Sequence, residues 1–224
     1  MSWILLAFAF FLGSIPFGLI ISRYWLGIDI RQQGSGNIGM TNVMRVGGKL
    51  PGALTFALDF FKGTAAVLLA QAWLSPELEP VDREFWVALI AVTAVCGHVF
   101  SVFLNFKGGK GVSTLFGVLA AVHLPTGLAA AAVWGGMFLW KRISSLSALT
   151  MLATLPFWLA VAPLRFGDEV FESRMWLFSG LAALLIYKHR SNITRLLSGE
   201  EGQLRASATS NSSDSLNPPA PGKE

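Results

Sequence analysis

Residues 112–140 read VSTLFGVLAAVHLPTGLAAAAVWGGMFLW, and they decide how many times the chain can cross a membrane. These 29 residues include no Asp, Glu, Lys or Arg. A membrane-spanning helix needs about 20 apolar residues, so the stretch is long for one span and short for two. Pro125 and Gly127 lie near its middle and favour a helix boundary there. The stretch is therefore either one long helix or two short helices that meet between His123 and Thr126.

The composition of the whole chain is typical of a membrane protein. Hydrophobic residues make up 53% of the 224 residues and charged residues only 13%. The amino terminus has neither the basic start nor the cleavage site of a signal peptide, so its apolar run is expected to be retained. The clear candidate spans are residues 3–22, 52–74, 84–104, 145–163 and 173–188.

The distribution of charge favours two short helices in the 112–140 stretch, which gives seven spans. One side of the membrane then collects Arg23, Arg31, Arg45, Lys49, Lys107, Lys110, Lys141, Arg142, Lys188, Arg190 and Arg195. The other side keeps only Arg83, Arg165 and Arg174, together with Glu77, Glu79, Asp82, Glu84, Asp168, Glu169 and Glu172. By the positive-inside rule the amino terminus is outside and the carboxyl terminus cytoplasmic. We therefore predict an all-α integral membrane protein with seven transmembrane helices, two of them short.

We expect one membrane domain, residues 1–202, followed by a tail, residues 203–224. The tail is rich in Ser, Asn, Pro and Ala and lacks aromatic residues, so we expect a disordered cytoplasmic segment. Cys96 is the only cysteine, which excludes a disulfide framework and a cysteine-ligated metal site. The net charge of +4 comes from basic residues placed between apolar runs, so it indicates topology and not a nucleic-acid partner. No metal and no cofactor is expected.

The first polar segment, Gly34–Gly39, matches the glycine pattern of dinucleotide-binding loops. The match is rejected because the segment follows Arg-Gln-Gln and precedes membrane helices, whereas that pattern needs a strand before it. Its glycines still permit close backbone approach to an anion. Polar donors follow in order: Ser35, Asn37, Thr41, Asn42 and the guanidinium of Arg45. The alternative is a glycine-rich turn with an arginine that only sets topology.

The second polar segment, Asn105–Thr114, resembles a nucleotide-binding P-loop but fails its spacing. Leu104 stands where the first glycine belongs, and Gly111 replaces the Ser or Thr, so nucleotide hydrolysis is not expected. Lys107 and Lys110 on a flexible backbone before a helix still suit a phosphate, because the amides, the helix dipole and the cations act together. The alternative is contact with anionic lipid headgroups.

Two further polar segments carry candidate residues. Ser144 and Ser145 follow the basic turn at 141–142, where helix capping explains a serine as well as catalysis does. His189 lies in the segment 188–195, KHRSNITR, and is the best candidate for acid–base work near neutral pH, although an interfacial histidine can also simply contact headgroups.

Asp59 and Lys62 form an unusual charged pair inside an apolar run. They are one helical turn apart and can pair with each other. Charges inside a membrane suggest function by default, but we favour a structural pair that satisfies itself.

Taken together, the polar segments resemble the bacterial acyl-phosphate:glycerol-3-phosphate acyltransferases of the PlsY type. The residues that carry the resemblance are Gly34–Asn42 with Arg45, Gly97-His98, Phe106–Val112, Lys188-His189, Asn192-Ile193 and Arg195–Leu197. The similarity covers roughly residues 1–202 in the same order. It implies a seven-helix enzyme in the bacterial cytoplasmic membrane, with its active site facing the cytoplasm.

The resemblance also implies a reaction. A fatty acyl group moves from acyl phosphate to the 1-hydroxyl of sn-glycerol 3-phosphate, which gives lysophosphatidic acid and phosphate without an acyl-CoA thioester. This is the first step of phospholipid synthesis. The implied partners are these two substrates, membrane lipids and a functional link to the soluble enzyme that makes acyl phosphate.

Site residues follow from the resemblance, position by position. The implied catalytic residues are Ser35, Arg45, Lys110, Ser145, His189 and Asn192. The implied substrate-binding residues are Gly36, Asn37, Thr41, Asn42, His98, Lys107, Gly108, Gly109 and Gly111. Glu201 matches a position that the family uses for integrity. Met40 and Ser101 depart from the family, which usually has a small residue and a proline there.

The expected mechanism is direct attack of the glycerol hydroxyl on the acyl carbonyl, with Arg45 and the lysines neutralising phosphate charge. Either His189 or a substrate phosphate can take the proton, and the sequence leaves this choice open. Two other functions stay possible at this point: a small-solute transporter that uses Asp59 and Lys62, and a scaffold whose basic loops bind anionic lipid.

Overall fold

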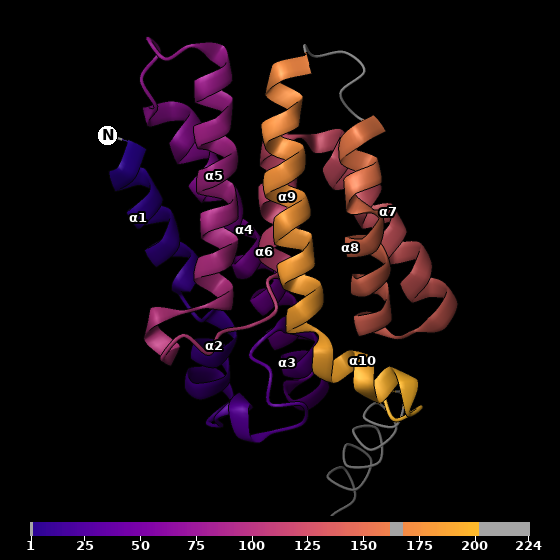
Figure 1. The fold of residues 1–224 in the computed structure, drawn as a ribbon. Helices are drawn as coiled ribbons and strands as arrows, with labels where there is room; N and C mark the ends of the chain where they lie inside the picture. Colours follow the sequence, from indigo (N-terminus) through magenta and orange to yellow (C-terminus); the bar gives the residue numbers. More distant parts are fainter. Residues whose placement is uncertain (1, 162–167, 202–224) are drawn as a thin grey trace, which may run out of the picture.

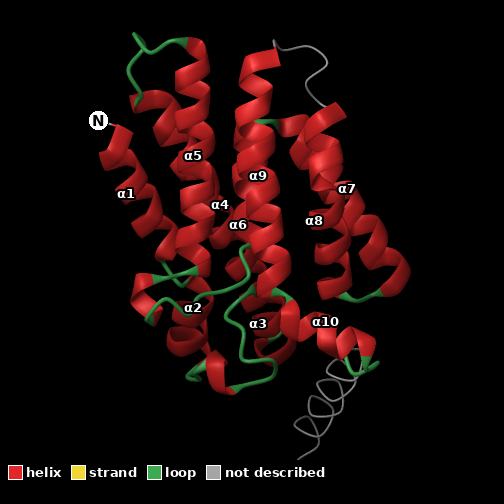
Figure 2. Cartoon of the chain, viewed as in Figure 1, coloured by secondary structure: helices red, strands yellow, loops and turns green. Residues whose placement is uncertain are grey.

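The computed structural model describes residues 2–161 and 168–201, and in this part of the chain all regular secondary structure is helical (Figures 1 and 2). Four segments in it are long and apolar enough to cross a membrane: Ser2–Leu26, Lys49–Trp73, Pro80–Leu104 and Ser144–Val161. A shorter apolar helix covers Val112–Val122. The predicted all-α class is therefore confirmed. The predicted tail, residues 203–224, lies outside the described residues.

The first predicted span is broken in the structure. Helix α1 (Ser2–Ser14) ends before Pro16, and α2 (Phe17–Leu26) begins after it. Proline has no amide hydrogen and its ring clashes with the preceding helical turn, so Pro16 ends the helix. The apolar run 3–22 therefore forms two helices and not the single helix that we expected.

The 112–140 stretch forms two helices, as the charge pattern predicts. Helix α6 (Val112–Val122) and α7 (Leu124–Lys141) meet at His123. The His123 imidazole accepts a hydrogen bond from the Thr126 amide at 3.3 Å, and Pro125 occupies the first turn of α7, where its missing amide hydrogen has no consequence. The reading of one long helix is wrong.

Helix α5 (Pro80–Val99) is the centre of the bundle and packs against α1, α4 (Lys49–Trp73), α6 and α9 (Asp168–Lys188). Glycine allows the closest approach, because a Cβ on Gly13 of α1 would lie 2.0 Å from the Ala94 carbonyl oxygen of α5. Helices α7 and α8 (Ser144–Val161) complete the other side of the bundle, where α8 also packs against α9 (Figure 1).

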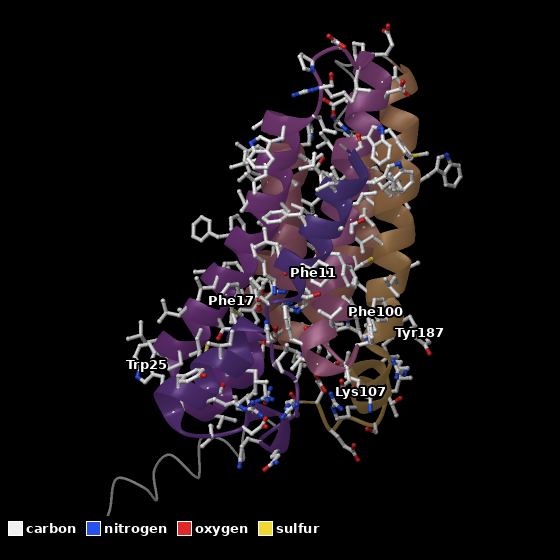
Figure 3. All side chains as sticks on the ribbon, turned by 90° about the vertical axis from the view of Figure 1, so that its left-hand side faces the viewer. Phe11, Phe17, Trp25, Phe100, Lys107 and Tyr187 are labelled. Atoms are coloured by element: carbon white, nitrogen blue, oxygen red, sulfur yellow. The ribbon has the colours of Figure 1, made fainter. Side chains whose placement is uncertain are left out.

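Short helices and polar loops gather at one end of the bundle. Below the long helices in Figure 1 lie α2, α3 (Met40–Gly47) and α10 (Arg190–Leu197). Two short turns, η1 (Ile30–Gln32) and η2 (Val102–Leu104), belong to the connecting loops. Figure 3 shows oxygen and nitrogen atoms concentrated towards the ends of the molecule, with Lys107 at the same end as Trp25. The polar segments are also in contact with one another, since Thr41 shares a hydrogen bond with Ser144 and Lys110 donates to Asn192.

Candidate active site

The first polar loop is shaped by Asn42, which is only 2% exposed. Its Oδ1 accepts from the Ser35 amide at 2.9 Å, and its Nδ2 donates to the carbonyls of Gln33 and Asn37, both at 2.9 Å. Both ends of the amide group are thus engaged by the loop. The structure gives Asn42 a role in shaping the loop, and its predicted contact with substrate stays a prediction.

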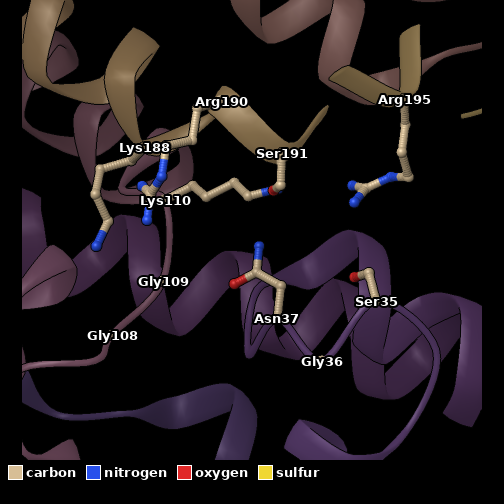
Figure 4. A pocket seen from close by; sticks show the side chains of 10 residues that line it. All are labelled: Ser35, Gly36, Asn37, Gly108, Gly109, Lys110, Lys188, Arg190, Ser191 and Arg195. Atoms are coloured by element: carbon tan, nitrogen blue, oxygen red, sulfur yellow. The ribbon is translucent and has the colours of Figure 1, made fainter. Parts of the chain in front are cut away.

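The glycines of this loop are required by its backbone. Gly34 and Gly36 have φ values of 57° and 70°, which is the left-handed region that favours glycine. The loop leaves Ser35 exposed, and Figure 4 shows its hydroxyl beside the side chain of Asn37. Thr41 lies on α3 and shares a hydrogen bond of 3.0 Å with the Ser144 hydroxyl, which ties α3 to the start of α8.

The second polar loop folds back on the end of α5. The Gly108 amide donates to the Val99 carbonyl and the Gly109 amide to the His98 carbonyl, both at 3.1 Å. These two amides are therefore engaged by α5, and the predicted contact of Gly108 and Gly109 with substrate stays a prediction. Gly111, with φ 81°, precedes the first residue of α6. Lys107 is exposed on the loop, whereas His98 is buried beneath it.

Four side chains form a chain of polar contacts from the second loop to the last described residue. The Lys110 ammonium donates to Oδ1 of Asn192, and Nδ2 of Asn192 donates to Glu201 at 2.5 Å. The other carboxylate oxygen of Glu201 accepts from Nε of Arg195 at 2.6 Å. Because Asn192 and Arg195 belong to α10, Glu201 fixes this helix and orients the amide that holds Lys110.

Electrostatics keep Glu201 ionised. Burial alone would raise the pKa of its carboxyl, but hydrogen bonding by Ser145, Asn192 and Arg195 outweighs burial and lowers it. The Ser145 hydroxyl is buried close to Glu201, where it contributes to this shift, and it has no other partner among the described residues. Ser145 therefore lies beside the Glu201 carboxylate, and its hydroxyl can form a further hydrogen bond to a ligand.

The pKa of the Lys110 ammonium lies closer to neutral pH than that of an ordinary lysine. Burial lowers the pKa of Lys110 to about 8, with attraction from Glu201 opposing the shift and repulsion from Arg195 and Arg45 adding to it. Arg45 is half-buried on α3 and its pKa is lowered, again mainly by burial. Within the described part of the chain no side chain forms a hydrogen bond or ion pair with the Arg45 guanidinium, which is therefore available for an anion.

His189 differs from what the sequence suggests. It is 3% exposed, and its Nδ1–H donates to the Leu185 carbonyl at 2.7 Å. Burial lowers the pKa of His189 to about 4, and the nearby Lys110 adds to the shift. Burial of the ring between α9 and α10, which the sequence does not reveal, therefore argues against acid–base work near neutral pH, and the catalytic role of His189 stays a prediction.

These elements enclose a cavity of 260 Å³ (Figure 4). It is lined by Ser35, Gly36, Asn37, Gly108, Gly109, Lys110, Lys188, Arg190, Ser191 and Arg195. The first six are predicted site residues, brought together from the two polar loops. Thr41, Asn42, Arg45, His98, Lys107, Gly111, Ser145, His189 and Asn192 are not among the lining residues.

Four lining residues were missed as site residues by sequence reasoning: Lys188, Arg190, Ser191 and Arg195. The three basic ones were counted for topology, and Lys188 and Arg195 also carry the family resemblance, but none was named as a site residue. Their position after an apolar run and close to His189 was the signal that could have identified them. With Lys110, they place four cationic side chains around one cavity. Such a cavity suits anions, because charge-assisted hydrogen bonds to phosphate oxygens are strong.

Comparison with known proteins agrees with this chemistry. The family profile described as glycerol-3-phosphate acyltransferase matches residues 3–199. The chain is 41% identical over 206 residues to the glycerol-3-phosphate acyltransferase of Thermosynechococcus vestitus, covering 89% of this chain and 93% of that protein. It is 42% identical over 198 residues to the one of Aquifex aeolicus, covering 88% and 96%.

Two solved structures share the fold. Both are crystal structures of PlsY (YgiH), an integral membrane glycerol 3-phosphate acyltransferase, one in a glycerol 3-phosphate form and one in a lysophosphatidic acid form. The TM-scores are 0.78 and 0.77 at 40% and 39% identity, and each match covers 89% of this chain and 93% of the other. The chain is thus a multi-pass integral membrane protein, and it belongs to the glycerol-3-phosphate acyltransferase family of the PlsY type.

Proposed function

We propose that this chain transfers a fatty acyl group from acyl phosphate to the 1-hydroxyl of sn-glycerol 3-phosphate and releases lysophosphatidic acid and phosphate. One observation carries the proposal: a cavity with four cations lies at one end of an apolar bundle in a chain of this family. The two PlsY structures, which are named for a glycerol 3-phosphate form and a lysophosphatidic acid form, support the acceptor and the product.

The cavity fits a reaction between two phosphates. Both substrates are anions, and they would repel each other unless cations lie between them. Lys110 and Arg195 extend towards each other from opposite sides of the cavity in Figure 4. Lys188 and Arg190 lie on the side of Lys110. One substrate is soluble and the other has an acyl chain, so a site at the end of the bundle serves both.

The mechanism needs no covalent enzyme intermediate. Acyl phosphate is a mixed anhydride with a good leaving group. The acceptor oxygen forms a bond to the acyl carbon, the bond from that carbon to the phosphate oxygen breaks, and the released phosphate carries the electron pair. Lys110, Arg45 and Arg195 would stabilise the charge that develops on phosphate. Ser35, which is exposed beside the cavity, would orient a substrate oxygen.

The proton of the acceptor hydroxyl would go to a substrate phosphate. A general base works best when its pKa lies near the operating pH, and the pKa of His189 is lowered to about 4. Its Nδ1 is also engaged by the Leu185 carbonyl. His189 would then hold the corner between α9 and α10. If His189→Ala removed a titration step between pH 6 and 7 from the profile of kcat/KM, His189 would be the base after all.

The seven-span topology belongs to the same proposal. The candidate spans are the α1–α2 segment followed by α4, α5, α6, α7, α8 and α9. The amino terminus would be outside and the basic end of the bundle, with the cavity and the carboxyl terminus, would face the cytoplasm of a bacterium. This orientation would also let the soluble enzyme that makes acyl phosphate deliver its unstable product directly.

A labelling experiment tests the orientation. In a Cys96→Ser background, Lys49→Cys lies at the basic end and Glu77→Cys in the loop at the other end. In intact cells, a thiol reagent that cannot cross the membrane should label Glu77→Cys only. Labelling of Lys49→Cys alone would reverse the proposed topology.

Phosphate release tests the activity. Purified protein in lipid is given palmitoyl phosphate with and without sn-glycerol 3-phosphate. Acceptor-dependent release should occur in the wild type and be lost in Arg45→Ala. Arg23→Ala is the matched control, because Arg23 pairs with Asp29 away from the cavity and Arg31 still satisfies that carboxylate. No release from folded wild-type protein, with uptake of labelled glycerol 3-phosphate into vesicles instead, would identify a transporter.

A further inference from the structure

Three buried polar side chains inside the bundle have no part in the mechanism above. The ammonium of Lys62 on α4 lies 2.7 Å from Oδ1 of Asp59 and 2.9 Å from Nδ1 of His98 on α5. It also donates to the Ile15 carbonyl at 2.7 Å. The exposed fractions of Asp59, Lys62 and His98 are 1%, 4% and 3%. We call these three residues the buried triad.

Stability alone does not explain the buried triad. Burying charges inside a membrane protein is costly, and apolar side chains of similar size often give equal or greater stability. A buried ionic group can instead serve to hold the neighbouring segments in one of several possible arrangements. The position of the triad, between the break in the first span and the second polar loop, indicates which geometry is fixed.

On one side the triad holds the break between α1 and α2. Ile15, whose carbonyl accepts from Lys62, is in that break. The neighbouring Ser14 is tied to the end of α5, because its hydroxyl donates to the Gly97 carbonyl at 3.3 Å and its carbonyl accepts from the Ser101 hydroxyl at 2.5 Å. The break, α4 and the last turn of α5 therefore form one hydrogen-bonded unit.

On the other side the triad supports the second polar loop through His98. The Gly109 amide donates to the His98 carbonyl, and a Cβ on Gly109 would lie 2.2 Å from Nε2 of the His98 ring. The next two nearest atoms are also ring atoms, Cε1 at 3.0 Å and Cδ2 at 3.1 Å. The loop thus rests on both the backbone and the ring of His98, and Lys110 follows it directly.

The orientation of this ring is set by Lys62. A lysine ammonium only donates hydrogen bonds, so Nδ1 of His98 accepts and the ring proton is on Nε2, the atom that faces Gly109. The Asp59 carboxylate, 3.4 Å from the same Nδ1, neutralises the ammonium. Removing the Lys62 contact would leave the ring free to turn, and the loop would lose a fixed support.

We propose that the buried triad is a positioning device for the second polar loop. Lys62 and Asp59 orient the His98 imidazole, and the imidazole sets where Gly108, Gly109 and Lys110 lie in the cavity. His98 then acts as a positioning residue and not as the substrate ligand that the family resemblance implies. The kinetic part of this inference rests on the proposed acyltransferase function, whereas the structural part does not.

A double-mutant cycle tests the contact between His98 and Gly109. Gly109→Ala should raise the KM for glycerol 3-phosphate about tenfold, because the new methyl group collides with the ring and displaces Lys110. His98→Asn keeps an acceptor near Lys62 but removes the atoms that face Gly109. In that background Gly109→Ala should change KM less than about twofold. Equal effects in both backgrounds would overturn the proposal. Gly136→Ala is the control, because an added Cβ there meets nothing within 4 Å.

Hydrogen–deuterium exchange tests the same inference without turnover. Lys62→Met should accelerate exchange of the Gly108 and Gly109 amides, while Lys49→Met, at an exposed lysine at the start of the same helix, should not. Should Lys62→Met fail to fold, Asp59→Asn is the second variant, with the same expectation. Unchanged protection of the loop in a folded variant would refute the inference even if the enzyme is active. If exchange is faster in Lys62→Met but the wild-type protein shows no acyltransfer, only the proposed function is refuted.

Discussion

Both polar loops contribute glycines to the lining of the cavity, but glycine has a different purpose in each. In the first loop Gly34 and Gly36 supply left-handed backbone, and a single side chain, Asn42, holds the resulting shape. In the second loop Gly108 and Gly109 supply space, because backbone or ring atoms of His98 lie where a Cβ would be. The first loop therefore depends on one amide group, and the second on packing against α5.

The largest effect is expected in the second loop. A Cβ on Gly108 would lie 2.0 Å from the His98 carbonyl oxygen, and a helix carbonyl cannot move aside as a flexible side chain can. Overpacking of this kind costs about 1–3 kcal/mol, and most of the strain would displace Lys110. Gly108→Ala should lower kcat/KM at least about 100-fold. The measurement is steady-state kinetics beside the melting temperature, and near wild-type kinetics would show that the loop tolerates a side chain.

Asn42→Ala should have the next largest effect, because it removes the amide that shapes the first loop. The Ser35 amide and the carbonyls of Gln33 and Asn37 lose their partner, at a cost of about 1–3 kcal/mol for each group left unsatisfied. We expect both the melting temperature and kcat/KM to fall. Asn42→Asp keeps only the acceptor for Ser35 and should be intermediate. A higher KM with an unchanged melting temperature would show instead that Asn42 binds substrate directly.

A pH profile distinguishes the two loops, because Lys110 of the second loop titrates in the measured range and Ser35 of the first loop does not. Lys110 attracts phosphate only when protonated, and its pKa is lowered to about 8, so its charge is present below that pH and lost above it. The wild-type kcat/KM should fall about fivefold between pH 8 and pH 9. Lys110→Arg should remove this alkaline fall, because a guanidinium stays charged there. Ser35→Ala, in the first loop, should lower activity without moving the profile.

The smallest effect is expected for Ser101→Pro. This position departs from the family's usual proline, yet its φ of −58° already suits one. The change removes the hydrogen bond from the Ser101 hydroxyl to the Ser14 carbonyl, which is worth about 0.5–1.5 kcal/mol. We expect a slightly lower melting temperature and turnover within about twofold of wild type. A large loss of activity would show that the second loop also depends on this serine.

The fold was largely predictable because its main signals are local. Apolar runs, Pro125 and the distribution of charge were sufficient to predict the two short helices of the 112–140 stretch. Pro16 carried a comparable local signal, but the apolar run around it suggested one unbroken helix. Membrane spans depend mostly on hydrophobicity along the chain, so a sequence reports them well.

The site was predicted less completely because its properties depend on tertiary packing. The six predicted lining residues come from two polar loops that the sequence identifies. Three properties could not be predicted, since each arises from contacts between distant helices: the engagement of the Gly108 and Gly109 amides by α5, the burial that lowers the pKa of His189, and the orientation of Lys188 and Arg190 towards the cavity.

The contact between Glu201 and Asn192 has a practical consequence for protein engineering. Glu201 is connected through Asn192 to Lys110, so an affinity tag or reporter protein is best fused well after residue 201. A chain cut before Glu201 would leave α10 without its carboxylate and Lys110 without an oriented partner. Crystallisation and expression designs should therefore keep Glu201 together with the membrane helices that it connects.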